Sequence, residues 1–173
     1  MKFLLLLLIA VGSSLAAVNG TCQTVVVPTT IRATGHAESI GDIVVYCFGV
    51  TGSGNVDVSI TVGAPVTSRV LIPGPPPGIE ALLLINEPGI SARFGGPVTQ
   101  IGCDADTARL HLCPTGANVV QGEVFGAFGV TFHVPIDGSS QLVSPPNPPF
   151  TILRITNVRV NAGGVPLGLG GVG

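Results

Sequence analysis

The chain has 173 residues, of which 46% are apolar and only 9% are charged, and its formal net charge at pH 7 is −2. Such a length suits one domain, and the apolar fraction excludes an intrinsically disordered chain. The few basic residues are scattered along the sequence without forming a cluster. This argues against nucleic acid and anionic lipid surfaces as partners.

The N-terminus has the order of a secretory signal peptide. Lys2 precedes the apolar run Phe3 to Val11, and the small residues of Gly12 to Ala17 follow it. We expect cleavage that removes residues 1–17, with export to the extracellular space or the cell surface and the periplasm as the alternative. The apolar run is shorter than the roughly 20 residues that span a bilayer, so we predict no transmembrane segment in the mature chain.

Alternation of apolar and polar residues predicts a series of short strands. The clearest case is Val56 to Val62, and Val119 to Phe125 with Phe128 to Val134 predicts a hairpin across Gly126 and Ala127. Phe125, Phe128 and Phe132 fall on hairpin positions that suit burial. In chain order the strand candidates are Thr24 to Ile31, Asp42 to Phe48, Val56 to Val62, Val66 to Ile72, Glu80 to Ile85, Val119 to Phe125, Phe128 to Val134 and Thr151 to Val160.

Seven or eight short strands without a convincing amphipathic helix predict an all-β fold. We expect an antiparallel β-sandwich, immunoglobulin-like or a related Greek key, with a partly open β-barrel as the alternative. The domain is predicted to span residues 18–161, and residues 162–173 form a Gly-rich tail or the start of a linker. The proline-dense segments Pro73 to Gly78 and Ser144 to Pro149 are predicted loops. Asn157 interrupts the alternation of the last strand, which indicates a local bulge.

Four cysteines lie in this predicted exported chain, where an oxidising environment favours disulfides over free thiols. They are Cys22, Cys47, Cys103 and Cys113, and three connectivities are open to them. We expect Cys22 to pair with Cys47 and Cys103 with Cys113, because each pair brackets one strand-loop-strand unit. A metal site is the alternative, but the Cys-x-x-Cys spacing typical of such sites is absent.

The sequence contains no catalytic or cofactor motif. Its three histidines are His36, His111 and His133, and none lies in a Gly-x-Ser-x-Gly or His-Glu-x-x-His pattern. We therefore predict that the protein is not an enzyme and binds no cofactor. His133 alternates out of the apolar face of its strand and is predicted to face solvent, whereas His111 is predicted to lie on a loop tethered by Cys103 and Cys113.

Asp104 and Asp106 are the best candidates for binding a metal ion, because oxygen ligands at alternate positions can share one calcium ion. The rest of a calcium loop, a glycine at its sixth position and a distant bidentate glutamate, is missing. A solvated acidic turn is the preferred interpretation, so we predict no metal.

A carbohydrate-binding or accessory hydrolytic domain is the alternative function. Its carboxylates would come from Glu38, Asp42, Glu80, Glu87 or Asp104, because paired carboxyl groups about 5 to 10 Å apart serve glycoside hydrolysis. Exposed aromatic side chains on which sugars stack are largely absent. The chain has no tryptophan, and its one tyrosine, Tyr46, lies beside Cys47 in a predicted core strand. The sequence therefore does not favour glycan binding.

Several segments resemble a group of poorly characterised exported proteins of soil bacteria. These segments are Cys22 to Pro28, Arg32 to Gly35, Glu38 to Val44, Val66 to Arg69, Glu80 to Ile85, Asn118 to Gly122 and Arg154 to Arg159. The resemblance covers nearly the whole mature chain and implies an extracellular or envelope-associated β-rich protein, with no catalytic residues to carry over. It also implies a longer chain, of which Gly173 ends a truncation or a shortened variant.

Export, many short strands and sparse charge together favour a non-catalytic structural or interaction module of the bacterial surface or matrix. We expect it to be adhesin-like and to associate with itself or with other surface proteins through strand edges. A low surface charge removes one barrier to such self-association.

Overall fold

The computed structural model describes residues 18–26, 35–86, 99–137 and 150–164, and these confirm an all-β fold. One short helix, α1 (Ala105–Arg109), and one 3-10 turn, η1 (Ala162–Gly164), accompany the strands. The strands are β1 (Asn19–Val26), β2 (Glu38–Ser39), β3 (Ile43–Thr51), β4 (Ser53–Thr61), β5 (Val70–Ile72), β6 (Gly78–Ile85), β7 (Gly102–Cys103), β8 (Val119–Phe125), β9 (Gly129–Asp137), β10 (Phe150–Thr156) and β11 (Arg159–Val160).

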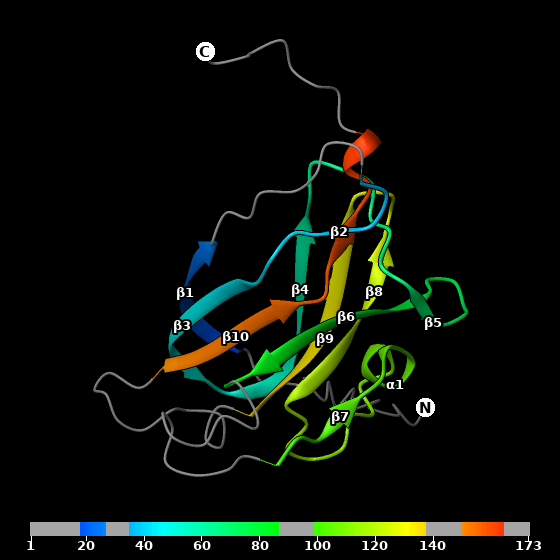
Figure 1. Cartoon of the computed structure of the whole chain (residues 1–173). Coiled ribbons are helices and arrows are strands. Elements are labelled where there is room, and N and C mark those ends of the chain that lie inside the picture. The colour runs from blue at the N-terminus through cyan, green and yellow to red at the C-terminus, as the bar shows by residue number, and fades with distance from the viewer. Residues whose placement is uncertain (1–17, 27–34, 87–98, 138–149, 165–173) are drawn as a thin grey trace, which may run out of the picture.

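Nine strands form one sheet, which curls into a half-barrel (Figure 1). Its order is β1-β3-β10-β6-β8-β9-β4, with β5 paired to β6 and β7 paired to β8 beside this path. The pairing is antiparallel except between β7 and β8, which run parallel. A separate two-stranded sheet joins β11 to β2. The predicted hairpin is confirmed as β8 and β9, which pair antiparallel.

The inner face of the curl holds the core. Along β6 every second side chain points inward, and Ile79, Ala81, Leu83 and Ile85 are at most 1% exposed. Phe132 in β9 packs so closely on β8 that a Cβ atom on Gly122 would lie 2.7 Å from its Cε1 atom. No real Cβ atom tolerates that distance without displacing a neighbour, so the aromatic ring lies directly on the glycine backbone.

Both predicted disulfides are confirmed. Cys22 and Cys47 face each other in the register of β1 and β3, with their Cα atoms 4.0 Å apart. The second disulfide joins Cys103 to Cys113, with Cα atoms 5.4 Å apart, and closes the loop that carries α1. The first bridge therefore fastens an edge strand to the sheet, and the second holds a short helix against it. This helix was not among the predicted elements.

The last predicted strand is divided in two, so the bulge expected at Asn157 is wrong. Asn157 has a φ of 61°, a left-handed conformation that asparagine tolerates better than most residues. β10 ends one residue before it, and β11 leaves the main sheet to pair with β2. Asn157 therefore redirects the chain from one sheet to another.

Other boundaries also shift. The segment predicted from Val66 to Ile72 is a strand only in its last three residues. After β11 comes η1, whose first residue, Ala162, is buried. The loop predicted from Pro73 to Gly78 is found between β5 and β6, except that Gly78 is the first residue of β6. The loop predicted at Ser144 to Pro149 lies outside the described residues.

Leu83 provides a test of the core. We expect Leu83→Ala to lower the free energy of unfolding by about 2 to 5 kcal/mol, because the side chain is fully buried and its removal leaves a cavity. Urea denaturation followed by circular dichroism measures this loss. Leu110→Ala is the matched control, since Leu110 is 63% exposed and its truncation should cost less than about 0.5 kcal/mol. Equal losses in the two variants would contradict the assigned core.

Candidate functional site

A groove of about 440 Å³ opens on the inner face of the half-barrel. β1 and β3 border it on one side and β4 on the other, while β10 contributes to its floor. The side chains that line it are mainly aliphatic and include Val45, Val56, Val58, Ile60, Ile136 and Leu153. We call this space the concave groove.

The rims of the concave groove are the two ends of the sheet. In the part of the chain that the structure describes, β1 pairs only with β3 and β4 pairs only with β9. The outer edge of each rim strand therefore presents backbone donors and acceptors without a neighbouring strand in the sheet. An apolar groove between two open strand edges is suited to an extended polypeptide.

The exposure of the inward side chains also shows that the sheet is open at its β4 end. The inward side chains of β6, at the centre of the sheet, are at most 1% exposed. In β4, Val56, Val58 and Ile60 also point inward and belong to the same core, but they are only partly buried. The apolar layer is thus complete at the centre of the sheet and incomplete at its β4 end.

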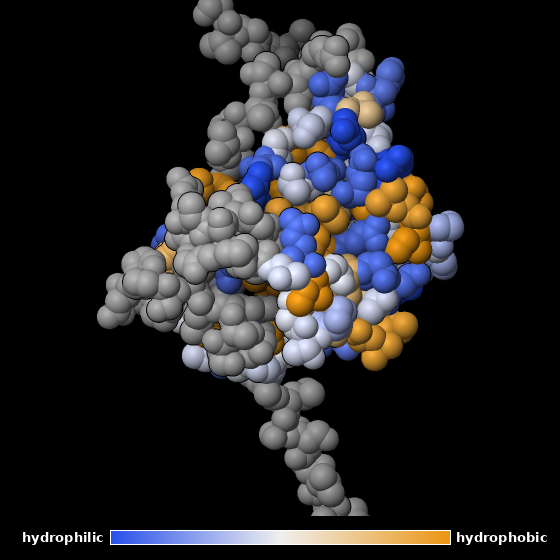
Figure 2. All heavy atoms as spheres, turned by 60° about the horizontal axis from the view of Figure 1, so that its bottom comes forward, coloured by the Kyte–Doolittle hydropathy of each residue, from blue (hydrophilic) through white to orange (hydrophobic). Residues whose placement is uncertain are grey.

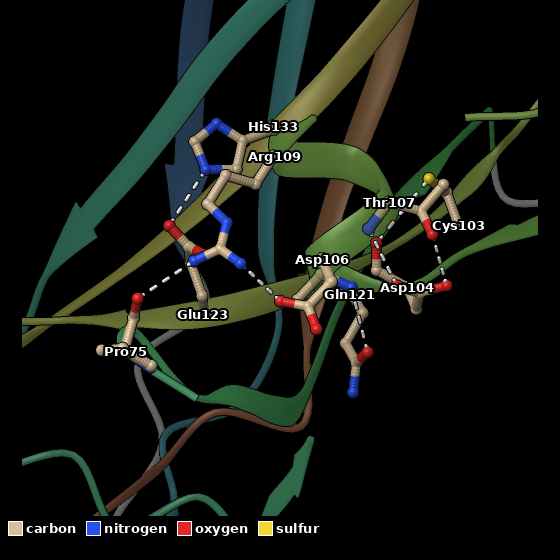
Figure 3. Close-up of polar contacts among 10 residues, drawn as sticks. Pro75, Cys103, Asp104, Asp106, Thr107, Arg109, Gln121, Glu123 and His133 are labelled. Atoms are coloured by element: carbon tan, nitrogen blue, oxygen red, sulfur yellow. Dashed lines mark hydrogen bonds and ion pairs between the residues drawn. The ribbon is translucent and has the colours of Figure 1, made fainter. Parts of the chain in front are cut away.

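A second cluster lies on the opposite, outer face of the sheet. His133 in β9 contacts a carboxylate on each neighbouring strand: its Nδ1 is 2.7 Å from Oδ1 of Asp57 in β4, and its Nε2 is 3.0 Å from Oε1 of Glu123 in β8. Figure 3 shows the contact between His133 and Glu123. We call these three residues the histidine clamp, because together they link three adjacent strands.

The histidine clamp favours a protonated ring. Burial of the ring by itself lowers the pKa of His133, but hydrogen bonds and charges from Glu123 and Asp57 outweigh this effect, so the pKa is raised above 6.5. Glu123 is 7% exposed, and its Oε2 atom is buried without a hydrogen-bond partner. Protonation of His133 places a positive charge 3.0 Å from this buried carboxyl group.

The prediction that His133 faces solvent is wrong. It does point away from the apolar face, but its side chain is only 14% exposed. The carboxylates of Asp57 and Glu123 enclose it from both sides, and the ring of His111 stands edge-on at 6.5 Å between centroids. His111 lies on the disulfide-closed loop as predicted and is exposed. A serine-type triad needs a hydroxyl on one histidine nitrogen, whereas carboxylates occupy both here.

Asp104 and Asp106, the predicted metal candidates, organise α1. Asp104 is the N-cap and accepts hydrogen bonds from the backbone N–H and the hydroxyl of Thr107, at 2.9 and 2.8 Å. These bonds lower the pKa of Asp104. Asp106 pairs with Arg109 at 2.6 Å, and Arg109 also donates to the carbonyl of Pro75 (Figure 3). Within the described ranges, no three His, Cys, Asp or Glu side chains are arranged to hold a metal ion.

The other predicted carboxylates pair with different arginines. Asp42 accepts a hydrogen bond from Arg154 at 2.8 Å, and Glu80 accepts one from Arg159 at 3.0 Å. Glu38 lies in β2, and Glu87 lies outside the described residues. The structure therefore does not bring Asp42, Glu80 and Asp104 together into one set of acidic groups.

Aromatic side chains differ from the prediction in two places. Tyr46 is only partly buried and contacts Phe150 with ring centroids 5.9 Å apart and planes tilted by 60°. Phe125 and Phe128, expected to be buried, are 65% and 47% exposed because they flank the tip of the β8–β9 hairpin. Phe132 alone of the three hairpin phenylalanines is buried as predicted.

Further exposed apolar side chains lie away from the groove. Leu110 and Leu112 project from the disulfide-closed loop and are 63% and 68% exposed. Figure 2 views the molecule from the lower end of Figure 1 and shows apolar atoms in separate patches divided by polar ones. The described surface visible from this side thus has no single broad apolar face.

Comparisons with known proteins add no relative. No family model, curated protein or solved structure matches the chain. The resemblance to exported soil-bacterial proteins therefore stays a prediction. None of the helices in the described part of the chain has the length and apolarity that a membrane crossing requires.

Neither the concave groove nor the histidine clamp was identified from the sequence. Alternation correctly placed His133 and Asp57 on the polar faces of their strands. This was the only feature of the sequence that pointed toward the histidine clamp. β4 pairs with β9 rather than with β3, its neighbour in sequence. Only the tertiary fold determines this pairing, which brings Asp57 to His133. The assignment of His133 to solvent assumed that nothing flanked it.

The cap on α1 yields one prediction. We expect Asp104→Ala to lower the free energy of unfolding by about 1 kcal/mol, because two bonds to Thr107 are lost at the helix N-terminus. Asp104→Asn should retain most of the stability, since an amide oxygen can still accept. Thermal and urea unfolding at neutral pH compare the variants. If both substitutions left stability unchanged, Asp104 would not cap the helix.

The histidine clamp yields a second prediction, on pH. A folded-state pKa above the unfolded value of 6.5 means that the clamp contributes its full stability below pH 6.5 and loses it as pH rises through the folded pKa. Urea unfolding at pH values below and above 6.5 should show this decline. His133→Gln should remove that part of the pH dependence, whereas the control His36→Gln, at an exposed position, should keep it. If His133→Gln kept the same dependence of unfolding free energy on pH, the role assigned to the histidine clamp would be contradicted.

Proposed function

We propose that this protein is an exported, non-catalytic interaction module that binds an extended polypeptide segment at the open end of its sheet. The observation that carries the proposal is the concave groove, which is apolar along its walls and bordered by the edges of β1 and β4. Binding of this kind adds a strand to a sheet: backbone hydrogen bonds supply affinity, and alternate side chains supply specificity.

The lining indicates the chemistry of the bound segment. The groove walls carry valine, isoleucine and leucine, and β4 presents Val56, Val58 and Ile60 at every second position. A matching segment has small or branched apolar residues at alternate positions and no charge on that face, because an unpaired charge placed against these walls would lose its hydration. The partner is therefore an uncharged, β-prone segment of protein.

The compartment supports the same proposal. The signal-like N-terminus predicts export, and both disulfides suit an oxidising environment. An exported module with open strand edges suits a structural or adhesin-like role at the cell surface or in the extracellular matrix. The predicted family resemblance, to exported β-rich proteins without known catalytic residues, points the same way.

Carbohydrate binding, the alternative, has less support. The carboxyl groups predicted to serve it pair with separate arginines, as Asp42 does with Arg154 and Glu80 with Arg159. The rings of Tyr46 and Phe48 are tilted by 60° and 48° to that of Phe150, so they do not form one flat platform for a sugar. The groove walls are mainly aliphatic, and the polar residues that also line the groove, such as Thr24 and Thr151, are few beside its valines, isoleucines and leucine.

A peptide titration tests the proposed function. We expect a fluorescently labelled peptide of alternating threonine and valine to bind saturably to the oxidised protein, as measured by fluorescence anisotropy. Val58→Lys should weaken binding at least tenfold, because it places a charge on the groove wall. Asn55→Lys is the matched control, since it adds the same charge to β4 on the outer face.

Two results would contradict the proposed function. One is an absence of saturable binding to any alternating peptide. The other is equal binding of a peptide with proline at every second position, because such a peptide cannot form a ladder along a strand edge. Circular dichroism of both lysine variants controls for loss of the fold.

A further inference from the structure

The described residues of the two rim strands carry little of the charge and none of the proline that usually keep sheet edges apart, although the register of β1 on β3 shifts between Asn19 and Thr21. Natural edge strands are blunted by lysine, proline, inward-pointing charges or cover from another element. β1 contains no charged residue and no proline, and β4 contains no proline and a single charge, Asp57. Both strands are long, with eight and nine residues. Each is therefore a competent template for another strand.

The single charge discriminates between ways of pairing two copies. Asp57 is the middle residue of β4 and its side chain is 63% exposed. Antiparallel pairing of β4 with β4 of a second copy, centred on the strand, would place Asp57 opposite Asp57, and like charges directly opposite each other are destabilising. In each copy His133 lies 2.7 Å from Asp57 and offsets this repulsion while its ring is protonated, so the repulsion is strongest when the ring is neutral. A shifted register avoids the clash only by shortening the ladder.

Pairing of β1 with β1 brings no like charges together, but it leaves the groove wall formed by β4 uncovered. Val56, Val58 and Ile60 are the partly buried apolar residues at the open end of the core, and all three lie in β4. Pairing of β1 with β4 brings an uncharged strand to that wall. In this pairing Asp57 lies opposite an uncharged residue of β1 rather than opposite another carboxylate.

We propose that β1 of one copy pairs with β4 of a second copy, so that the occupant of this open edge is the same protein joined head to tail. The proposal rests on the proposed function, because it names the partner that the open edge of the sheet receives. Such a contact uses two different surfaces, so each added copy presents a fresh edge and the assembly grows as a filament unless its rotation closes a ring.

Edge-blocking variants test the proposal. Thr24→Lys blocks β1, since Thr24 is exposed and lines the groove, and Val58→Lys blocks β4. Gln23→Ala and Asn55→Ala are the controls, because they change the opposite faces of the same two strands without adding a lysine to either edge. Light scattering coupled to size exclusion measures the mass of each oxidised protein across a concentration series.

Head-to-tail pairing predicts a distinctive pattern. Wild type and both controls should increase in mass with concentration, whereas Thr24→Lys and Val58→Lys should each remain monomeric. An equimolar mixture of the two blocked variants should form a species of twice the monomer mass and nothing larger. The open β4 of Thr24→Lys can pair with the open β1 of Val58→Lys, and both remaining edges of that dimer are blocked. Thr24→Lys added to wild type should also lower the mean mass, which tests the proposal even if Val58→Lys fails to fold.

Other outcomes overturn the proposal. Dimers of Thr24→Lys alone would show pairing of β4 with β4, and dimers of Val58→Lys alone would show pairing of β1 with β1. Wild type that stays monomeric at all concentrations would also refute head-to-tail pairing. If this monomer still binds the alternating threonine–valine peptide, the proposed function survives without the second copy. If it binds no peptide, both fail.

Discussion

In the described part of the chain one short helix accompanies the sheet, so the sheet has to cover most of its own apolar face, and it does so by curling. The inward residues of β6 and β9 become fully buried because other parts of the same sheet stand opposite them. Curling also determines where burial ends. The strands at the two ends of the path, β1 and β4, border one groove without pairing with each other. The core and the open groove are thus two results of one constraint.

Local patterns in the sequence were sufficient for most of the strands. Alternation in β4 and β9 reports which side chains face the core, and the two strands of the β8–β9 hairpin are adjacent in the chain. The disulfides could be predicted for the same reason, since each joins cysteines close in sequence. α1 escaped prediction because it has five residues, too few for a helical period to emerge.

The candidate site depends on contacts that no local pattern contains. Asp57 and Glu123 meet His133 only because β4 and β8 lie on either side of β9. Asp104 showed the right chemistry, an oxygen acceptor, but its nearest donors are the backbone and hydroxyl of Thr107 rather than a cation. A carboxylate followed three residues later by threonine is as consistent with a helix cap as with an ion-binding turn. Residue type alone does not distinguish the two.

The position of β10 has a consequence for how the chain folds. β10 lies between β3 and β6 in the sheet, yet it follows both of them, and β8 and β9 as well, in the sequence. Pairing between strands so distant in sequence slows folding, because a long loop must close first. Until Phe150 to Thr156 is in place, β3 and β6 each keep an open edge in addition to those of β1 and β4. The partly folded chain is therefore most prone to misassembly just before β10 pairs with β3 and β6.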